Sequence, residues 1–329
     1  MKKAIILLSL ASLLILSSCA QVNTSPEPQR IYESGPDIEV YFCPLDDCEG
    51  ILGRNLQQAE ESLHCALFDL DLNSAIDIII KKKKEIDVKI VLDNDNKGGH
   101  LSNINGVIRF DNGNRLSHNK FCIIDNKRLI TGSMNPTELG TKKNNNNLLI
   151  LRSPTLIANY NAEFEELWDG RFGKGEAVQH PVAYYNGIGI ENYFCPEDDC
   201  KGRIIKALRK AEQSVHFMAF VFTDDDMADT ILIKDIGIKG VFDTRQATTQ
   251  YSEYPRMKDF GIEVRRDGNP ATMHHKVFII DNKTVITGSM NPTASANEKN
   301  DENILIIHDE GIAKLFALEF ERVWEEGRE

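Results

Sequence analysis

The chain has 329 residues, of which 27% are charged, and its formal net charge is −12 at pH 7. This length is sufficient for two units that each bury a core of ordinary size. An acidic body does not attract polyanions over its whole surface, which excludes nucleic-acid binding by overall charge. A nucleic-acid substrate would therefore need a locally basic groove.

The N-terminus predicts export. Lys2 and Lys3 precede an apolar run over residues 4–16, and small residues follow it. The run is too short to span a bilayer comfortably, and its flanks are typical of a signal peptide. No other segment is apolar enough to span a membrane, so we expect any membrane attachment to come from this end alone.

Residues 16–19, Leu-Ser-Ser-Cys, resemble a bacterial lipobox. The resemblance implies a signal peptide over 1–18, lipid attachment to the Cys19 thiol and a tether over 19–37. The protein would then be a membrane-anchored lipoprotein that faces the periplasm or the cell exterior. The alternative is a plain signal peptide cut near Ala20. Because acyl chains would hold the protein in the membrane fraction, a Cys19→Ser variant that stayed there would contradict the anchor.

After the tether, apolar patterning predicts alternating strands and helices. Strands are expected over residues 38–42, 62–70, 88–92 and 148–151, and helices over 49–61, 74–84 and 154–168. Asn73 is the expected cap of the second helix, and Lys81 to Lys84 form its solvated end, where lysines suit the helix dipole. The pattern is that of an α/β fold with a mixed sheet.

Four cysteines lie in two copies of one spacing, Cys43 to Cys48 and Cys195 to Cys200. In an exported protein this spacing favours two local disulfides, and a shared four-cysteine zinc site is the alternative. Two further cysteines, Cys65 and Cys122, occupy positions that hold phenylalanine in a second copy of the sequence, Phe217 and Phe278. A phenylalanine equivalent argues for buried packing rather than chemistry.

That second copy extends over most of the chain. His64 matches His216 at an offset of 152, and His118 matches His274 at an offset of 156. Residues 118–137 and 274–293 are identical at fifteen of twenty positions. We therefore expect two duplicated units, residues 38–170 and 190–329, each a mixed β-sheet flanked by helices, joined by a glycine-rich linker over 171–189.

The repeated block predicts a β-hairpin with a polar patch. Side chains two apart on a strand share a face, so His118 and Lys120 point the same way. A turn at residues 126–127 would place Lys120 opposite Ser133 and His118 opposite Asn135. The second copy would likewise gather His274, Lys276, Ser289 and Asn291. Asp125 and Asp281 would lie at the distant turns, so we interpret both as structural.

The full pattern is His-x-Lys, four residues, Asp, then Gly-Ser-x-Asn, and it occurs twice at fixed register. It resembles the HKD motif of the phospholipase D superfamily, and the resemblance extends from about Ile38 to Trp324. It implies a pseudo-twofold fold in which both motifs meet in one cleft. It also implies that one histidine attacks phosphorus to form a phosphohistidine, while the other protonates the leaving alcohol and then activates water.

The residue types suit this chemistry without a cofactor. A neutral imidazole is a competent nucleophile near pH 7, and a second one can serve as acid and base. Lys120, Lys276, Asn135 and Asn291 would supply positive charge and donors to the phosphoryl oxygens, replacing the usual divalent metal. Ser133, Ser289 and Asn146 are expected to bind substrate. A duplicated hairpin without activity is disfavoured, because neither copy has lost a functional residue type.

One offset assigns different roles to the histidines. Glu302 lies 28 residues after His274, and Asn146 lies 28 residues after His118. In the superfamily an acidic or amide residue at this offset typically orients the motif histidine of the opposite half. Crossover pairing would join Glu302 to His118, the expected nucleophile, and Asn146 to His274, the expected acid/base. The alternatives are pairing within each half, which would make His274 the nucleophile, and mere capping of the following strand.

Other polar residues have a structural interpretation. His64 and His216 lie inside apolar strands and are expected in the core. Asp224 to Asp226 suit the start of a helix better than a metal site.

The substrate class stays open at this point. The expected anchor and the acidic body favour a phospholipid, hydrolysed or transferred. The compact size and the polar loops over 93–106 and 244–254, which offer no apolar surface for acyl chains, favour the alternative, a non-specific DNA or RNA endonuclease of the same superfamily.

Overall fold

The structure, a computed structural model, describes residues 30–113 and 115–328, of which 31–328 belong to one compact unit. The expected signal peptide and Cys19 lie outside the described residues. No helix within the described part of the chain is long and apolar enough to cross a membrane.

Seven strands form the sheet of the first half, in the order β2-β8-β7-β6-β3-β4-β5. They are β2 (Glu39–Cys43), β3 (Ser62–Leu67), β4 (Asp87–Leu92), β5 (Ile108–Phe110), β6 (Lys120–Ile124), β7 (Arg128–Gly132) and β8 (Asn146–Leu151). The helices are α1 (Cys48–Gln57), α2 (Asn73–Lys82), α3 (Glu138–Lys142) and α4 (Pro154–Trp168), with 3₁₀ turns over Asn94–Asn96 and Gly99–Val107. Strand β3 is parallel to β4 and antiparallel to β6, so the sheet is mixed.

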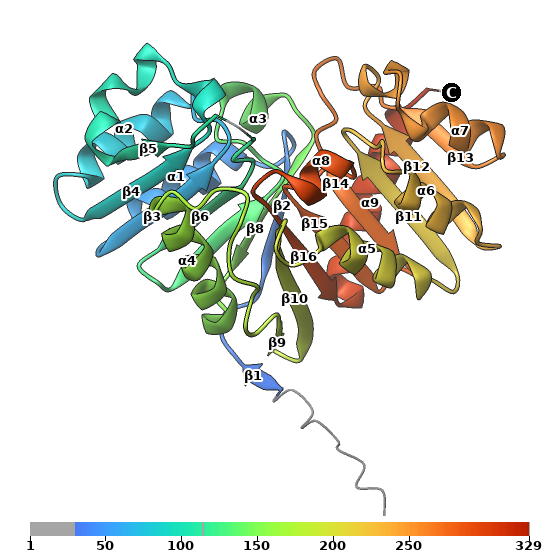
Figure 1. The fold of residues 1–329 in the computed structure, drawn as a ribbon, viewed down its shortest axis with the longest axis horizontal. Coiled ribbons are helices and arrows are strands. Elements are labelled where there is room, and N and C mark those ends of the chain that lie inside the picture. Colours follow the sequence, from blue (N-terminus) through green and yellow to red (C-terminus); the bar gives the residue numbers. More distant parts are fainter. Residues whose placement is uncertain (1–29, 114, 329) are drawn as a thin grey trace, which may run out of the picture. The chain divides into compact units, whose positions relative to one another are not determined.

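The second half repeats this plan around a nine-stranded sheet, in the order β1-β9-β10-β16-β15-β14-β11-β12-β13. The strands are β1 (Ile31–Glu33), β9 (Val182–Tyr185), β10 (Ile188–Cys195), β11 (Ser214–Ala219), β12 (Gly237–Phe242), β13 (Glu263–Arg266), β14 (Lys276–Ile280), β15 (Thr284–Gly288) and β16 (Glu302–His308). The helices are α5 (Cys200–Arg209), α6 (Asp225–Leu232), α7 (Glu253–Asp259), α8 (Ala294–Glu298) and α9 (Glu310–Glu326), with a 3₁₀ turn over Gln246–Thr248. The predicted fold class, two duplicated α/β units, is confirmed (Figure 1).

The long helices α4 and α9 place the two halves against each other. Helix α4 begins where the Ser153 hydroxyl accepts a hydrogen bond from the Leu156 amide at 3.2 Å, directly before Pro154. Its apolar side chains, such as Tyr160 and Phe164, belong to one continuous buried cluster with Phe316 of α9. Two further clusters, one beneath α1 and α2 and one beneath α5 and α6, fill the outer side of each sheet. The halves therefore share a central core in addition to their own.

The hairpin register differs by one residue from the expected one. Asp125 and Asn126 both adopt positive φ, 55° and 52°, and Ile124 pairs with Arg128, so the connection contains three residues. Short polar side chains tolerate this left-handed backbone, which explains why the turn forms one residue earlier. If this register is extended to the start of β6, Lys120 does not lie directly opposite Ser133, whereas the expected two-residue turn would place it there. The second copy has the same shift, since Ile280 pairs with Thr284.

The cysteines form three disulfides. Cys43–Cys48 and Cys195–Cys200 are bonded as expected. Cys65 and Cys122, expected as plain buried packing, are also bonded, because β3 and β6 place them directly opposite each other. Both are buried as the phenylalanine equivalents indicated, so the prediction was right about burial and missed the bond.

Two smaller expectations also differ from the structure. Helix α2 begins at Asn73 itself, and Leu72 is its N-cap with no side-chain hydrogen bond. Leu72 is buried, and its amide bonds the carbonyl of Pro136, which fixes this helix start without a polar cap. The segments expected as tether and linker contain β1 and β9, which pair in parallel at one edge of the second sheet.

Candidate active site

The two His-x-Lys motifs occupy equivalent places at the starts of β6 and β14. Lys120 and Lys276 are the first residues of these strands, and each histidine lies two residues earlier. All four side chains are buried, with His118 6% and His274 8% exposed. Each lysine ammonium donates to the carbonyl of its own histidine, at 2.6 Å in the first copy and 2.7 Å in the second.

Backbone hydrogen bonds join each motif to the opposite half. The His118 amide donates to the Asp301 carbonyl at 2.9 Å, directly before β16 of the second half. The His274 amide donates to the Asn145 carbonyl at 2.9 Å, directly before β8 of the first half. This exchange brings both motifs to the interface between the halves.

The side-chain partners of the histidines also cross between the halves. Glu302 Oε2 lies 2.8 Å from Nδ1 of His118 and accepts a second hydrogen bond from the Ser289 hydroxyl at 2.6 Å. Asn146 Oδ1 lies 2.9 Å from Nδ1 of His274 and accepts a hydrogen bond from the Ser133 hydroxyl at 3.1 Å. An acceptor at Nδ1 holds the proton there and leaves Nε2 of each ring for chemistry.

The structure places three residues differently from the expectation that they bind substrate. Ser133, Ser289 and Asn146 are fully buried. The two hydroxyls donate to Asn146 and Glu302, and Asn146 Nδ2 donates to the Gly140 carbonyl of its own half. They hold the groups that orient the histidines. Asn135 and Asn291 are half-buried, and the Oδ1 atom of each is buried without a partner among the described residues. The acceptor oxygen of each amide is therefore unused within this part of the chain.

The electrostatics favour neutral imidazoles. Burial, followed by the charges of Lys120 and Lys276, holds the pKa of both histidines well below its usual value. Burial raises the pKa of Glu302 to about 8, although both lysines and the Ser289 hydroxyl act in the opposite direction. Burial likewise lowers the pKa of Lys120 to about 7. The site thus contains several groups that exchange protons close to neutral pH.

The repeated offset also identifies a second pair of contacts that sequence reasoning missed. Asn147 Nδ2 lies 3.1 Å from Nδ1 of His275, and Asn303 donates to the Asn119 amide oxygen at 2.7 Å. His275 in turn contacts Glu319 of α9 at 3.0 Å. Asn147 lies 28 residues after Asn119, and Asn303 lies 28 residues after His275. Each asparagine contacts the residue of the opposite copy, so the offset that identified Glu302 could have identified them.

Asp125 and Asp281 lie at the hairpin turns and contact backbone. Asp125 accepts hydrogen bonds from the amides of Glu60, Glu61 and Ser62, and Asp281 accepts the equivalent three. His64 and His216 stack on Phe164 and Phe320. None of these contacts reaches the motif histidines.

A duplicated α/β fold whose two His-x-Lys motifs exchange partners across one interface defines a two-motif protein with a single shared site. Residues 52–168 and 204–324 both match the sequence model of the family described as "Cardiolipin synthase, PLD-like domain". The chain belongs to this family.

Relatives and solved structures agree with this membership. The chain is 34% identical to the mitochondrial cardiolipin hydrolase of Xenopus laevis, over 40% of this chain and 66% of the relative. It is 30% identical to a phospholipase D of Rickettsia typhi, over 39% of this chain and 64% of the relative. The chain thus spans only part of the length of these relatives. The structure of phosphatidylserine synthase from Haemophilus influenzae shares the fold, with a TM-score of 0.65 at 12% identity, covering 86% of this chain and 85% of that one.

Proposed function

We propose that the protein is a metal-independent phosphodiesterase that hydrolyses phosphatidyl groups through a phosphohistidine intermediate. The observation that carries the proposal is the crossed pairing of His118 with Glu302 and of His274 with Asn146. It creates two unlike imidazoles, one beside a carboxylic group and one beside a neutral amide. The names of the relatives, a cardiolipin hydrolase and a phospholipase D, support a phospholipid as the substrate.

His118 is the nucleophile in this mechanism. Ionised Glu302 accepts a hydrogen bond from the Nδ1–H group of His118 and so leaves the Nε2 lone pair free. That lone pair attacks phosphorus while the bond to the leaving alcohol breaks. The ring gains positive charge as the P–N bond forms, and the carboxylate stabilises that charge. Lys120, Lys276, Asn135 and Asn291 bind the phosphoryl oxygens and stabilise their developing charge.

His274 is the acid and then the base. An anionic phosphodiester beside it favours the imidazolium form, which donates its Nε2 proton to the leaving alcohol. The neutral ring then accepts a proton from water, and the resulting hydroxyl oxygen attacks phosphorus as the P–N bond to His118 breaks. Asn146 orients the ring and adds no charge, which suits a group that must both give and take a proton.

The substrate is tested by direct comparison in excess chelator. Vesicles of phosphatidylcholine and of cardiolipin, plasmid DNA and single-stranded RNA are each incubated with the protein, with His118→Asn and His274→Asn as inactive variants. Because the two histidines act as one unit, each variant should lose on the order of a thousandfold or more. His180→Asn, at an exposed histidine outside the site, is the matched control. Cleavage of nucleic acid alone would favour the endonuclease alternative, and activity restored only by a divalent ion would refute the metal-free mechanism.

The nucleophile is tested by trapping. A slow substrate with a radioactive phosphoryl group is turned over, and the reaction is quenched in alkali or cold acid before proteolysis. We expect the label on the peptide that carries His118, because Glu302 stabilises the charged ring only there. A label on the His274 peptide would contradict the assignment of roles.

A further inference from the structure

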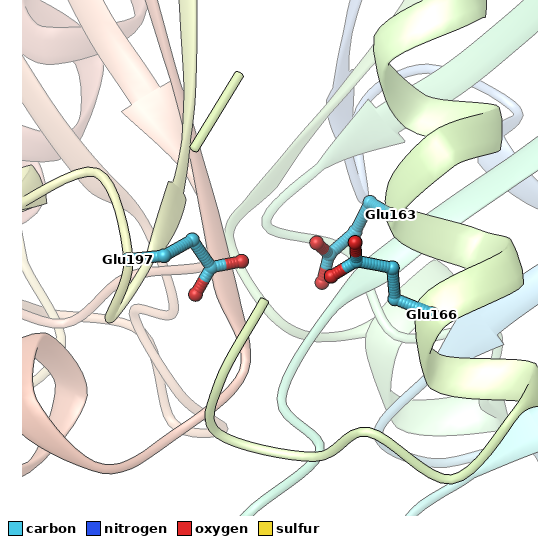
Figure 2. Close-up of side chains that lie close together, drawn as sticks. All are labelled: Glu163, Glu166 and Glu197. Atoms are coloured by element: carbon cyan, nitrogen blue, oxygen red, sulfur yellow. The ribbon is translucent and has the colours of Figure 1, made fainter. Parts of the chain in front are cut away.

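Three carboxylates from both halves converge at a second place on the interface, outside the proposed catalytic network. Glu163 and Glu166 project from α4 of the first half, and Glu197 comes from the turn between β10 and α5 of the second half. Figure 2 shows the three carboxylates pointing toward one another. One ligand oxygen of each lies within 4.8 Å of the others.

The protein supplies little compensation for these charges. Glu163 is only 6% exposed, and among the described residues the charged groups that act on it are other carboxyl groups. One oxygen of Glu197 is buried without a partner in this part of the chain. Of the three glutamates, Glu166 has an ion pair in the described part of the chain, with Arg171 at 3.2 Å. It also accepts a hydrogen bond from the Glu176 amide at 3.1 Å. Buried charges without partners are strongly unfavourable, so the group requires a counter-charge.

A fourth carboxylate provides an independent observation beside the three glutamates. Asp301 is 3% exposed, and its Oδ2 atom is buried with no partner in the described residues. Its Oδ1 accepts the amide of Gly173 at 2.5 Å, in the segment that continues over the glutamates. In that segment a Cβ on Gly175 would lie 2.3 Å from a Glu166 oxygen and 2.7 Å from a Glu197 oxygen, which shows how closely the backbone covers the carboxylates.

We propose that Glu163, Glu166 and Glu197 bind a hard divalent cation of the calcium type, which joins the two halves. Calcium takes six to eight oxygen ligands at about 2.3–2.6 Å in flexible geometry, so oxygens on opposite sides of the ion lie at most about 5 Å apart. The spacing of the three carboxylates fits such a sphere. Three carboxylates with one arginine carry a formal charge of −2 (−3 plus 1), which a dication neutralises.

Protons compete for the same oxygens. Only ionised carboxylates bind a cation, so the calcium titration is carried out at pH 8. The site lies outside the catalytic network and goes beyond the proposed function, because its predicted effect is on stability and not on the chemical step.

The test uses the full-length protein, dialysed first against chelator and then against metal-free buffer at pH 8. Calorimetric titration with calcium chloride should show one saturable site per chain. Calcium at about one hundred times its Kd should raise the Tm by about 5 °C, because the ion binds only the folded state. Glu163→Gln and Glu197→Gln should each abolish both signals. Glu165→Gln, a solvent-exposed neighbour on the same helix, should retain them.

Wild-type protein without a calcium-dependent heat or Tm shift would overturn the proposal and leave protons as the counter-charge. Equal shifts in wild type and both glutamine variants would also overturn it. Circular dichroism first verifies that each variant folds, and the titration of wild type decides the question even if one variant does not. Initial hydrolysis rates at 25 °C in chelator should equal those in calcium, which separates this site from the proposed catalytic mechanism.

Discussion

At the scale of single residues, one difference between the repeats creates the asymmetry of the site. Glu302 and Asn146 occupy the same position in their copies and make the same contact to a motif histidine of the opposite half. Only Glu302 can carry charge. A symmetric duplication thereby acquires two histidines with different electrostatic partners, which suits a reaction with a distinct nucleophile and acid.

This asymmetry leads to a prediction about pH. In the proposed mechanism Glu302 is ionised and accepts a hydrogen bond from Nδ1–H of His118, so kcat/KM should rise with pH toward the Glu302 pKa of about 8. Lys120 must be protonated to bind the phosphoryl oxygens, so activity should fall as pH rises above its pKa of about 7. We therefore expect a narrow bell-shaped profile with its maximum between these values, measured on bis(p-nitrophenyl) phosphate.

A variant separates the two limbs of that profile. Glu302→Gln should lower the rate and remove the rising limb, because the amide does not titrate. Glu165→Gln, which removes an exposed carboxylate of α4, should leave the profile unchanged. A wild-type rate that stays flat from pH 5 to pH 9 would show that neither group controls the chemistry.

The sequence was informative about which residues form the site and less informative about what each one contacts. The repeated motif and its 28-residue offset indicated the residues that the structure brings together. The burial of Ser133, Ser289 and Asn146 depends on how β7, β8, β15 and β16 pack at the interface. A local motif contains no information on that packing, so their positions behind the histidines could not be predicted.

At the scale of elements, local sequence patterns predicted helices, whereas contacts between strands far apart in the sequence could not be predicted from them. The helix over Pro154–Trp168 was predicted with both ends correct, because Ser153, Pro154 and an apolar stripe mark it locally. The bond between Cys65 and Cys122 depends on β3 lying beside β6, across 57 residues of sequence. In the other copy Phe217 and Phe278 also lie opposite each other on neighbouring strands. The match of the two cysteines to these two phenylalanines therefore indicated a cross-strand pair as well as burial.

The Cys65–Cys122 disulfide should stabilise the fold more than the local Cys43–Cys48 disulfide does. If a disulfide acts by restricting the unfolded chain, a 57-residue separation should contribute about 4 kcal/mol and a five-residue separation about 2 kcal/mol. The free energy of unfolding should therefore fall further in the Cys65→Ala, Cys122→Ala double variant than in the Cys43→Ala, Cys48→Ala one. Urea denaturation measures both.

The two double variants are matched, because each replaces two buried cysteines by alanine. Equal losses, or a larger loss for the local pair, would contradict the entropic argument. Intact-mass measurement of the unreduced protein checks the premise, since three disulfides remove six hydrogens (three times two). Stoichiometric zinc with free thiols would instead support the alternative metal site at the two Cys-Pro motifs.

At the scale of the whole molecule, the duplication predicted two units with their own cores but not the core that they share. Each outer cluster lies within one half, as the repeat indicated. The central cluster combines α4, α9 and the inner faces of both sheets. In it Phe42 of the first half packs on Phe316 of the second, with 5.1 Å between the ring centroids. The loop over residues 244–254 also differs in one respect from its polar description, because Tyr251 is 73% exposed.

A shared core predicts that the halves unfold together. The chain contains two tryptophans, one per half, and both have equivalent surroundings. Trp168 lies on Phe164 with the Arg109 guanidinium 4.0 Å from its ring centre, and Trp324 lies on Phe320 with Arg265 at 4.2 Å. A Trp168→Phe variant reports on the second half alone, and a Trp324→Phe variant reports on the first.

Urea unfolding followed by tryptophan fluorescence should give the same midpoint and slope in both single-tryptophan variants, and far-UV circular dichroism should give that midpoint again. The physical reason is that separating the halves would expose the central cluster and break the crossed hydrogen bonds of both motifs. Each half alone would then lose apolar contacts that its own outer core does not replace. Because the two substitutions are equivalent in chemistry and position, they should destabilise the protein by similar amounts. Two distinct midpoints, with one half unfolding while the other retains its fluorescence, would show that the halves are independent domains and that the shared core contributes little.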